Sequence, residues 1–166
     1  MKWWTKAILI LAIAVLVGSV CAMVWVLRAK ASINEYILRS TAAFNAAMLT
    51  NAEETYTEPD KAVIARYEGQ RAVVAPENYK AVLYYLKGNA APPLFRHADP
   101  DHALILTVCD ETVFTVSFAP DGESGVLEMR SGGKSITMRI SNFGLKDRLL
   151  ACALTGTSAA DSIQLP

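Results

Sequence analysis

The chain has 166 residues, with 16 Lys and Arg against 16 Asp and Glu, so its formal net charge is zero. That length leaves room for one modest globular domain. Four bases, Lys2, Lys6, Arg28 and Lys30, flank the first apolar stretch, so twelve of the 16 bases stand with all 16 acids after it, a net charge of about −4. This balance excludes the basic footprint of a nucleic-acid-binding protein and a polybasic lipid-binding cluster.

Residues 7–27 form an uninterrupted apolar stretch, AILILAIAVLVGSVCAMVWVL. It contains no charge and no proline, and only Gly18 and Ser19 are not clearly apolar. At about 1.5 Å per residue, a helix of this length crosses a hydrocarbon core of roughly 30 Å. A soluble core helix would need a polar face, which this stretch lacks. We therefore expect a transmembrane helix that contacts the lipid bilayer, with residues 1–30 as a membrane anchor.

A cleaved signal peptide is the alternative for the same stretch. The apolar run is longer than the usual 7–15 residues of a signal peptide. The segments 20–22 and 29–31, which each end in alanine, nevertheless leave two sites at which cleavage remains open. A lipoprotein signal is disfavoured because Val20, which precedes Cys21, is not a small residue. We favour an uncleaved signal anchor.

The charges on the two sides of the span are nearly balanced. Lys2 and Lys6 with the amino terminus face Arg28, Lys30 and Arg39, which is close to a tie under the positive-inside rule. A six-residue tail is easily left in the cytoplasm while the rest of the chain is exported. We therefore expect a single-pass protein of the cell membrane, with its N-terminus inside and its domain outside.

The segment between Leu27 and Asn51 contains no glycine and no proline and is rich in alanine. An interrupted apolar stripe runs along it at helical spacing; its members are Ile33, Ile37, Phe44 and Met48. The membrane helix can therefore run on, with or without a hinge near Lys30, into an amphipathic helix over residues 32–52. We expect its stripe to pack on its own domain. A protein partner for the 32–52 helix is the alternative.

Residues 31–156 predict a small α+β domain, and residues 157–166 predict a flexible tail. β-Branched and alternating runs predict strands at residues 62–67, 71–74, 103–109, 112–118, 126–130 and 135–140. Helices are expected at residues 76–87, with Pro76 at the first position and Gly88 at C′, and at residues 143–154. The order is therefore helix, two strands, helix, four strands and helix, with an antiparallel β-meander packed by helices.

The last hairpin has a register that can be predicted. Gly132 and Gly133 are typical of a two-residue turn, which places Met129 opposite Ile136 and Leu127 opposite Met138. All four side chains are apolar. The other face then carries Glu128, Arg130, Thr137 and Arg139. Because a slip of one residue would destroy this sorting, we expect one buried and one solvated face.

The densest polar cluster lies at residues 97–102 and contains His97, Asp99, Asp101 and His102. Imidazole and carboxylate groups together are able to hold a divalent metal, as a metal-dependent hydrolase or binder requires. The spacing matches no common metal site, and the intervening Pro100 limits how the ligands converge. We expect a solvated loop with no metal and no cofactor, and keep the metal site as the minority hypothesis.

Cys109 and Cys152 are the cysteines expected outside the membrane, so an oxidising compartment permits a disulfide between them. Two buried free thiols are the alternative. Residues 132–135 (GGKS) end like a phosphate-binding loop, but Glu128 stands where that loop needs glycine and the segment opens a strand. Asp110 and Glu111 are explained by the turn that they are expected to form.

The order of an anchor, a helix and a sheet resembles membrane-anchored NTF2-like domains of secretion and conjugation machines. A long hydrophobic helix followed by a β-meander also resembles type IV pilin-like proteins. The short charged leader lacks the glycine–aromatic cleavage site of that second family, and no glutamate follows near the start of the apolar run.

With no specific catalytic pattern in the chain, we favour a membrane-anchored, non-enzymatic interaction or assembly module. A hydrolase or metal-dependent binder that uses the 97–102 loop stays open. So does a sensor domain whose sheet binds a small ligand or a peptide.

Overall fold

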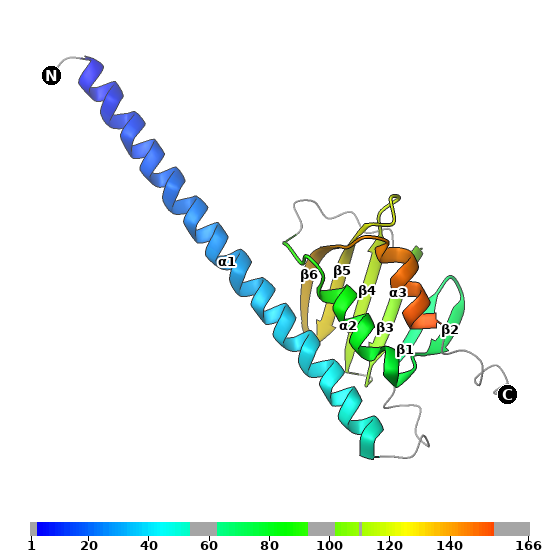
Figure 1. The fold of residues 1–166 in the computed structure, drawn as a ribbon. Helices are drawn as coiled ribbons and strands as arrows, with labels where there is room; N and C mark the ends of the chain where they lie inside the picture. Colours follow the sequence, from blue (N-terminus) through cyan, green and yellow to red (C-terminus); the bar gives the residue numbers. More distant parts are fainter. Residues whose placement is uncertain (1–2, 54–62, 93–101, 110, 155–166) are drawn as a thin grey trace.

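The computed structural model describes residues 3–53, 63–92, 102–109 and 111–154 (Figure 1). In chain order its elements are α1 (Trp3–Glu53), β1 (Val63–Tyr67), β2 (Gln70–Val73), the 3-10 turn η2 (Pro76–Asn78), α2 (Tyr79–Lys87), β3 (Ala103–Val108), β4 (Thr112–Phe118), β5 (Ser124–Ser131), β6 (Lys134–Ser141) and α3 (Leu145–Leu154). The α+β class and the order of helices and strands are therefore confirmed. Of the loops expected at 53–60 and 89–101, residues 54–60 and 93–101 lie outside the described residues, as does the tail expected at 157–166.

The six strands form one antiparallel sheet in the order β2-β1-β3-β4-β5-β6. The β1–β2 hairpin joins the β3–β6 meander through pairing of β1 with β3. The second half of α1, then α2, then α3 lie side by side over one face of this sheet, while the first half of α1 projects away from it (Figure 1). The result is a two-layer domain carried at one end of a long helix.

Helix α1 runs without a break over 51 residues. Its continuity follows from the absence of glycine and proline between Leu27 and Asn51, because these are the residues that break or kink helices. The hydroxyls of Ser40 and Thr41 donate back to the carbonyls of Tyr36 and Ile37, at 2.6 and 2.7 Å. The hinge considered near Lys30 is not present.

The second half of α1 supplies the centre of the core. Tyr36, Phe44 and Ala47 are fully buried, and Ile33, Ile37 and Met48 pack against them at the edge. The ring of Phe44 lies 5.8 Å from that of Phe114 on β4 and 6.2 Å from that of Tyr79 on α2. The expectation that this stripe packs on its own domain is confirmed.

The register predicted for the last hairpin is confirmed. Met129 pairs with Ile136 and Leu127 with Met138, around a turn in which Gly132 and Gly133 have φ of 56° and 73°. Leu127, Met129 and Met138 are buried under the helices, whereas Ile136, on the edge strand, is only half-buried. The turn and the apolar pattern therefore specify the same pairing.

Two local expectations were wrong. The β1–β2 turn consists of Glu68 and Gly69 alone, so Gln70 belongs to β2 and pairs with Tyr67. At the end of α2, Gly88 has φ −58°, and the left-handed residue is Asn89, with φ 39°. A Cβ at Gly88 would lie 3.2 Å from the side-chain nitrogen of Asn142, so a side chain there would require that amide to shift.

Candidate functional site

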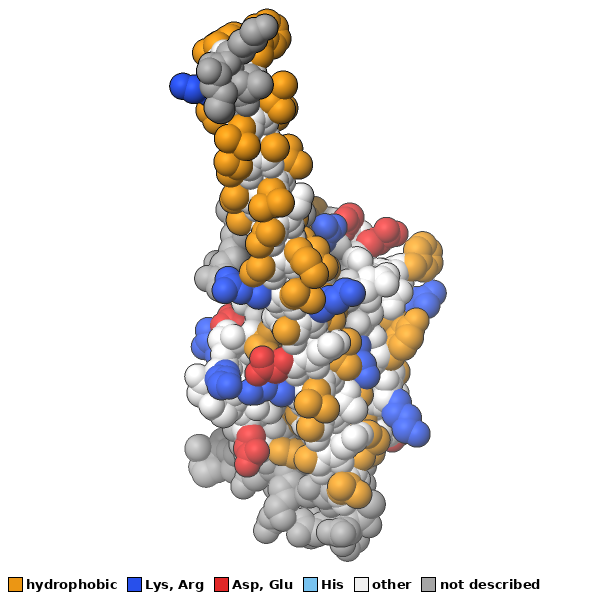
Figure 2. Space-filling view, turned by 90° about the vertical axis from the view of Figure 1, so that its left-hand side faces the viewer, with side chains coloured by type: hydrophobic (Ala, Val, Ile, Leu, Met, Phe, Trp, Pro, Cys, Tyr) orange, Lys and Arg blue, Asp and Glu red, His pale blue; other side chains and the backbone are white. Residues whose placement is uncertain are grey.

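The first half of α1 carries large apolar side chains on all sides. Fourteen of them between Ile8 and Leu27 are exposed. Figure 2 shows apolar side chains along the visible face of the projecting part of the helix, and basic side chains lying where this part meets the domain. Arg28 and Lys30 are exposed at this junction. In the described part of the chain, α1 is the one helix that is long and apolar enough to cross a membrane.

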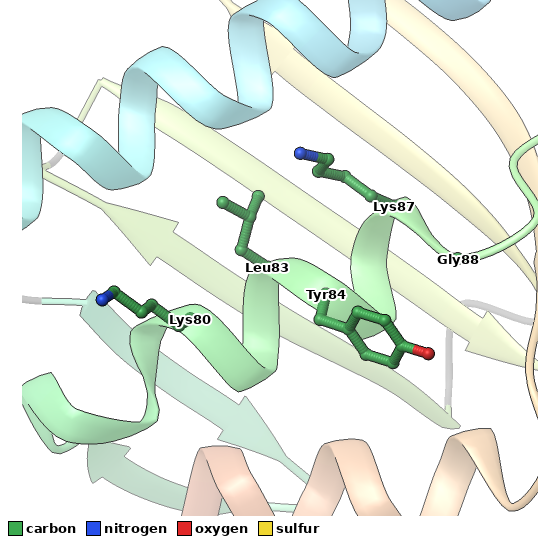
Figure 3. Close-up of a pocket in the computed structure, with 5 residues that line it drawn as sticks. All are labelled: Lys80, Leu83, Tyr84, Lys87 and Gly88. Carbon is green, nitrogen blue, oxygen red and sulfur yellow. The ribbon is translucent and has the colours of Figure 1, made fainter.

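A shallow groove of about 370 Å³ lies along α2 in the helical layer. It is lined by Lys80, Leu83, Tyr84, Lys87 and Gly88 (Figure 3). The Lys87 ammonium donates to the Thr41 hydroxyl of α1 at 3.2 Å, and Tyr84 packs edge-to-face on Tyr85. The ammonium groups of Lys80 and Lys87, beside the exposed phenol of Tyr84, are suited to a weak polar contact with a ligand. None of the described residues that line the groove is a carboxylate, a thiol or an imidazole.

The three tyrosines of this region have different roles. Tyr79 is buried in the core and Tyr85 is half-buried, whereas Tyr84 is exposed in the groove. Of these three, Tyr84 is therefore the one that lines the groove.

The face of the sheet that the three helices leave uncovered carries an unusual pair of cations. Arg66 on β1 stands directly opposite Arg71 on β2, and both are exposed. Together with Ile105 on β3, they line a hollow of about 440 Å³ that includes the β1–β2 turn. Among the described residues, no acid forms an ion pair with either arginine. Like charges directly opposite each other destabilise a sheet, so a bound anion would relieve this pair.

The end of the β1–β2 hairpin also borders a second hollow, of about 350 Å³, lined in part by Tyr67, His102 and Lys146. The Lys146 ammonium lies 6.0 Å from the centre of the Tyr67 ring. The Nδ1 atom of His102 is 3.4 Å from Oε1 of Glu68, and both side chains are well exposed. This is an exposed surface contact.

The predicted metal ligands are only partly visible. His97, Asp99 and Asp101 lie outside the described residues, and His102 is the exposed histidine that faces Glu68. Among the residues that the structure describes, no three histidine, cysteine or acidic side chains are grouped as a metal site would need. The metal site at 97–102 stays a prediction.

Cys109 and Cys152 are half-buried, pack against the core and form no disulfide with each other. Cys109 follows β3 with φ 51°. Neither thiol is bonded to the other here, so the disulfide between them stays a prediction for an oxidising compartment. Cys21 is exposed on the projecting part of α1.

Among the residues that the structure describes, two groups have displaced pKa values, and neither indicates catalysis. Burial raises the pKa of the Tyr36 phenol, whose hydroxyl donates to the Leu86 carbonyl at 2.7 Å. The hydrogen bond to Glu128, with its negative charge, raises the pKa of Arg130 on the uncovered face. The Tyr36 hydrogen bond joins α1 to α2, and Arg130 and Glu128 form a surface ion pair.

Comparisons of the chain with protein-family models, curated proteins and solved structures find no significant match in any of the three.

Proposed function

We propose that the chain is a single-pass membrane protein. Residues 7–27 lie in the lipid, the N-terminus is cytoplasmic, and the domain outside acts as a non-enzymatic interaction or assembly module. The observation that carries this proposal is the exposed apolar surface of the first half of α1.

The magnitude of that surface supports the proposal. Fourteen large apolar side chains are exposed between Ile8 and Leu27. At about 1.5 kcal/mol or more for each side chain removed from water, their burial in lipid contributes on the order of 20 kcal/mol. That exceeds the roughly 5–15 kcal/mol by which a typical domain is stable. Leaving this surface in water is therefore the less favourable arrangement.

The unbroken α1 supports a role in assembly over one in chemistry. Because the same helix continues from the apolar half into the core, the orientation of the domain follows that of the anchor. The described surface offers shallow hollows and exposed charges, with no nucleophile paired to a base. A hydrolase that uses His97, Asp99, Asp101 and His102 remains the alternative.

Alkaline carbonate extraction of membranes from cells that express the full chain tests the anchor. The parent chain should stay in the membrane pellet. Lysines in place of Ile13 and Val17 each cost about 2.5–3.5 kcal/mol at the centre of a span, so the double variant should leave the pellet. Leucines at the same two positions are the matched control and should behave like the parent. A parent chain found in the soluble fraction would refute the proposal.

A second candidate function is the binding of an anionic ligand, and the Arg66–Arg71 pair favours it. Two guanidinium groups on neighbouring strands present a fork of donors that suits carboxylate or phosphate oxygens. Ile105 provides an apolar floor beside them. This candidate corresponds to the sensor hypothesis, with a negatively charged small molecule or peptide as ligand.

Thermal melting with inorganic phosphate as the probe tests this second candidate. Phosphate should raise the melting temperature of the parent more than sodium chloride of equal ionic strength does. The increment should vanish when Arg66 and Arg71 are both replaced by glutamine. Arg130→Gln is the control, because Arg130 lies on the same face and is already paired with Glu128. An equal effect of phosphate on the parent and the double variant would exclude the site.

A further inference from the structure

The side of α1 that faces away from the domain carries a continuous uncharged stripe. In the half that packs on the sheet, its members succeed one another at spacings of three and four residues, so they lie on one line along the helix: Ala31, Asn34, Leu38, Ala42, Asn45 and Leu49. All six are exposed, and the side chains of Leu38 and Leu49 are 71% and 66% exposed. We call this set the outward stripe.

The same line continues through the projecting half of the helix with the same spacings, and there its members are all large and apolar: Leu9, Ile13, Leu16, Val20, Val24 and Leu27. Figure 2 shows apolar side chains continuing from the projecting part onto the part of α1 that covers the domain. The charges of this region stand beside the line, and two of them, Glu35 and Arg39, pair with each other at 2.8 Å. Two copies of the stripe would therefore meet without like charges between them.

Lipid does not cover the outward stripe beyond the span. Leu38 lies eleven residues past Leu27, which is about 16 Å along the helix axis. The polar headgroup layer on one side of a bilayer is only about 5–8 Å thick. A helix perpendicular to the bilayer would therefore hold Leu38 and Leu49 in water, where their burial needs a protein surface.

We propose that this surface is the outward stripe of a second copy of the chain, with the two α1 helices packed in parallel and in register. The inference rests on the proposed membrane anchor, because a bilayer holds every copy in one orientation and at one depth. Each residue of the stripe then meets its own counterpart. An asparagine amide is both donor and acceptor, so Asn45 is able to pair with Asn45 of the other copy. A polar residue within an apolar seam also specifies register and a pair rather than a larger bundle.

The size of the stripe indicates that the bilayer is part of this assembly. Six small or medium side chains over the domain half form a seam shorter than three heptads, well below the roughly 1,200–2,000 Å² of a standard stable interface. Pairing through the domain half alone is therefore expected to be weak. The dimer should form where the projecting halves are held side by side.

Cysteine cross-linking of the full chain in membranes tests the proposal. Cys21, Cys109 and Cys152 are first replaced by serine, and one cysteine is then placed at Ala42 on the outward stripe or at Tyr84 on α2. Tyr84 is a matched control, since its side chain is 64% exposed on another helix of the same layer. A mild oxidant should give a disulfide-linked dimer for Ala42→Cys and none for Tyr84→Cys. Adding Leu38→Asp and Leu49→Asp to Ala42→Cys should abolish the dimer.

The membrane fraction is measured for every variant, so that the two proposals fail separately. Loss of the parent from the membrane would refute the anchor and the dimer together. Protein that stays in the membrane but cross-links no better through position 42 than through position 84 would refute the dimer and leave the anchor intact. Cross-linking that survives the two aspartates would likewise exclude the outward stripe as its interface.

Discussion

At the scale of single residues, Tyr36 joins α1 to the rest of the domain. Its ring is buried, and its hydroxyl donates to the Leu86 carbonyl of α2. We expect Tyr36→Phe to lower the free energy of unfolding by about 1–3 kcal/mol, because the buried carbonyl then loses its donor. Chemical denaturation of the detergent-solubilised chain measures this. A neutral effect would mean that water replaces the hydroxyl.

The same residue predicts how stability depends on pH. Because burial raises the pKa of Tyr36 above its ordinary value of about 10, the folded state retains this proton where the unfolded state loses it. The contribution is complete below about pH 10 and decreases as the pH rises above that value. The parent should therefore lose stability more steeply between pH 10 and 11 than Tyr36→Phe does. Parallel curves for the two chains would contradict this assignment.

Met129 and Arg130 are neighbours on β5 that point to opposite faces of the sheet. Met129 is buried, so Met129→Ala should lose roughly 2–5 kcal/mol through lost contacts and the cavity left behind. Arg130 is exposed on the uncovered face, so Arg130→Ala should leave the melting temperature almost unchanged. Equal effects of the two substitutions would show that the register is wrong.

The histidines provide the test of the metal hypothesis. If residues 97–102 form only a loop, replacing His97 and His102 together by alanine should change stability within about ±0.5 kcal/mol, as surface sites typically do. Zinc should then not alter the melting temperature of the parent. Stabilisation by zinc that disappears in the double variant would establish the metal site.

At the scale of elements, the parts that the sequence predicts well are those in which two independent signals agree. The Gly132–Gly133 turn and the alternation on both sides of it each specify the β5–β6 pairing. Gly88 is different, because the side chain that approaches it closely, Asn142, is more than fifty residues away. Such a contact has no local signature.

The Arg66–Arg71 pair was missed for a related reason. The turn between the two strands was assigned three residues rather than two, and that hides which residues face each other. A two-residue turn at Glu68 and Gly69, both with positive φ, places the arginines opposite. The pairing of β1 with β3 is non-local and cannot be derived from periodicity alone.

The continuity of α1 also makes a prediction at this scale. Amide hydrogen exchange of the full chain in lipid nanodiscs should be slow from residue 24 through residue 40, since an unbroken helix satisfies every backbone amide there. Rapid exchange confined to residues 28–32 would show a hinge between anchor and domain. The asparagines of the outward stripe would then not be held in line with the projecting half.

At the scale of the whole molecule, the proposed anchor gives one helix two environments: lipid around its first half and a sheet against one side of its second half. Labelling of single cysteines tests this division most directly. In a full chain without Cys21, Cys109 and Cys152, one cysteine replaces Lys2 or Lys134, and intact cells are treated with a membrane-impermeant maleimide. The cysteine at position 134 should react at once, and that at position 2 only after the membrane is opened. Reaction of both positions from the same side would contradict a spanning α1.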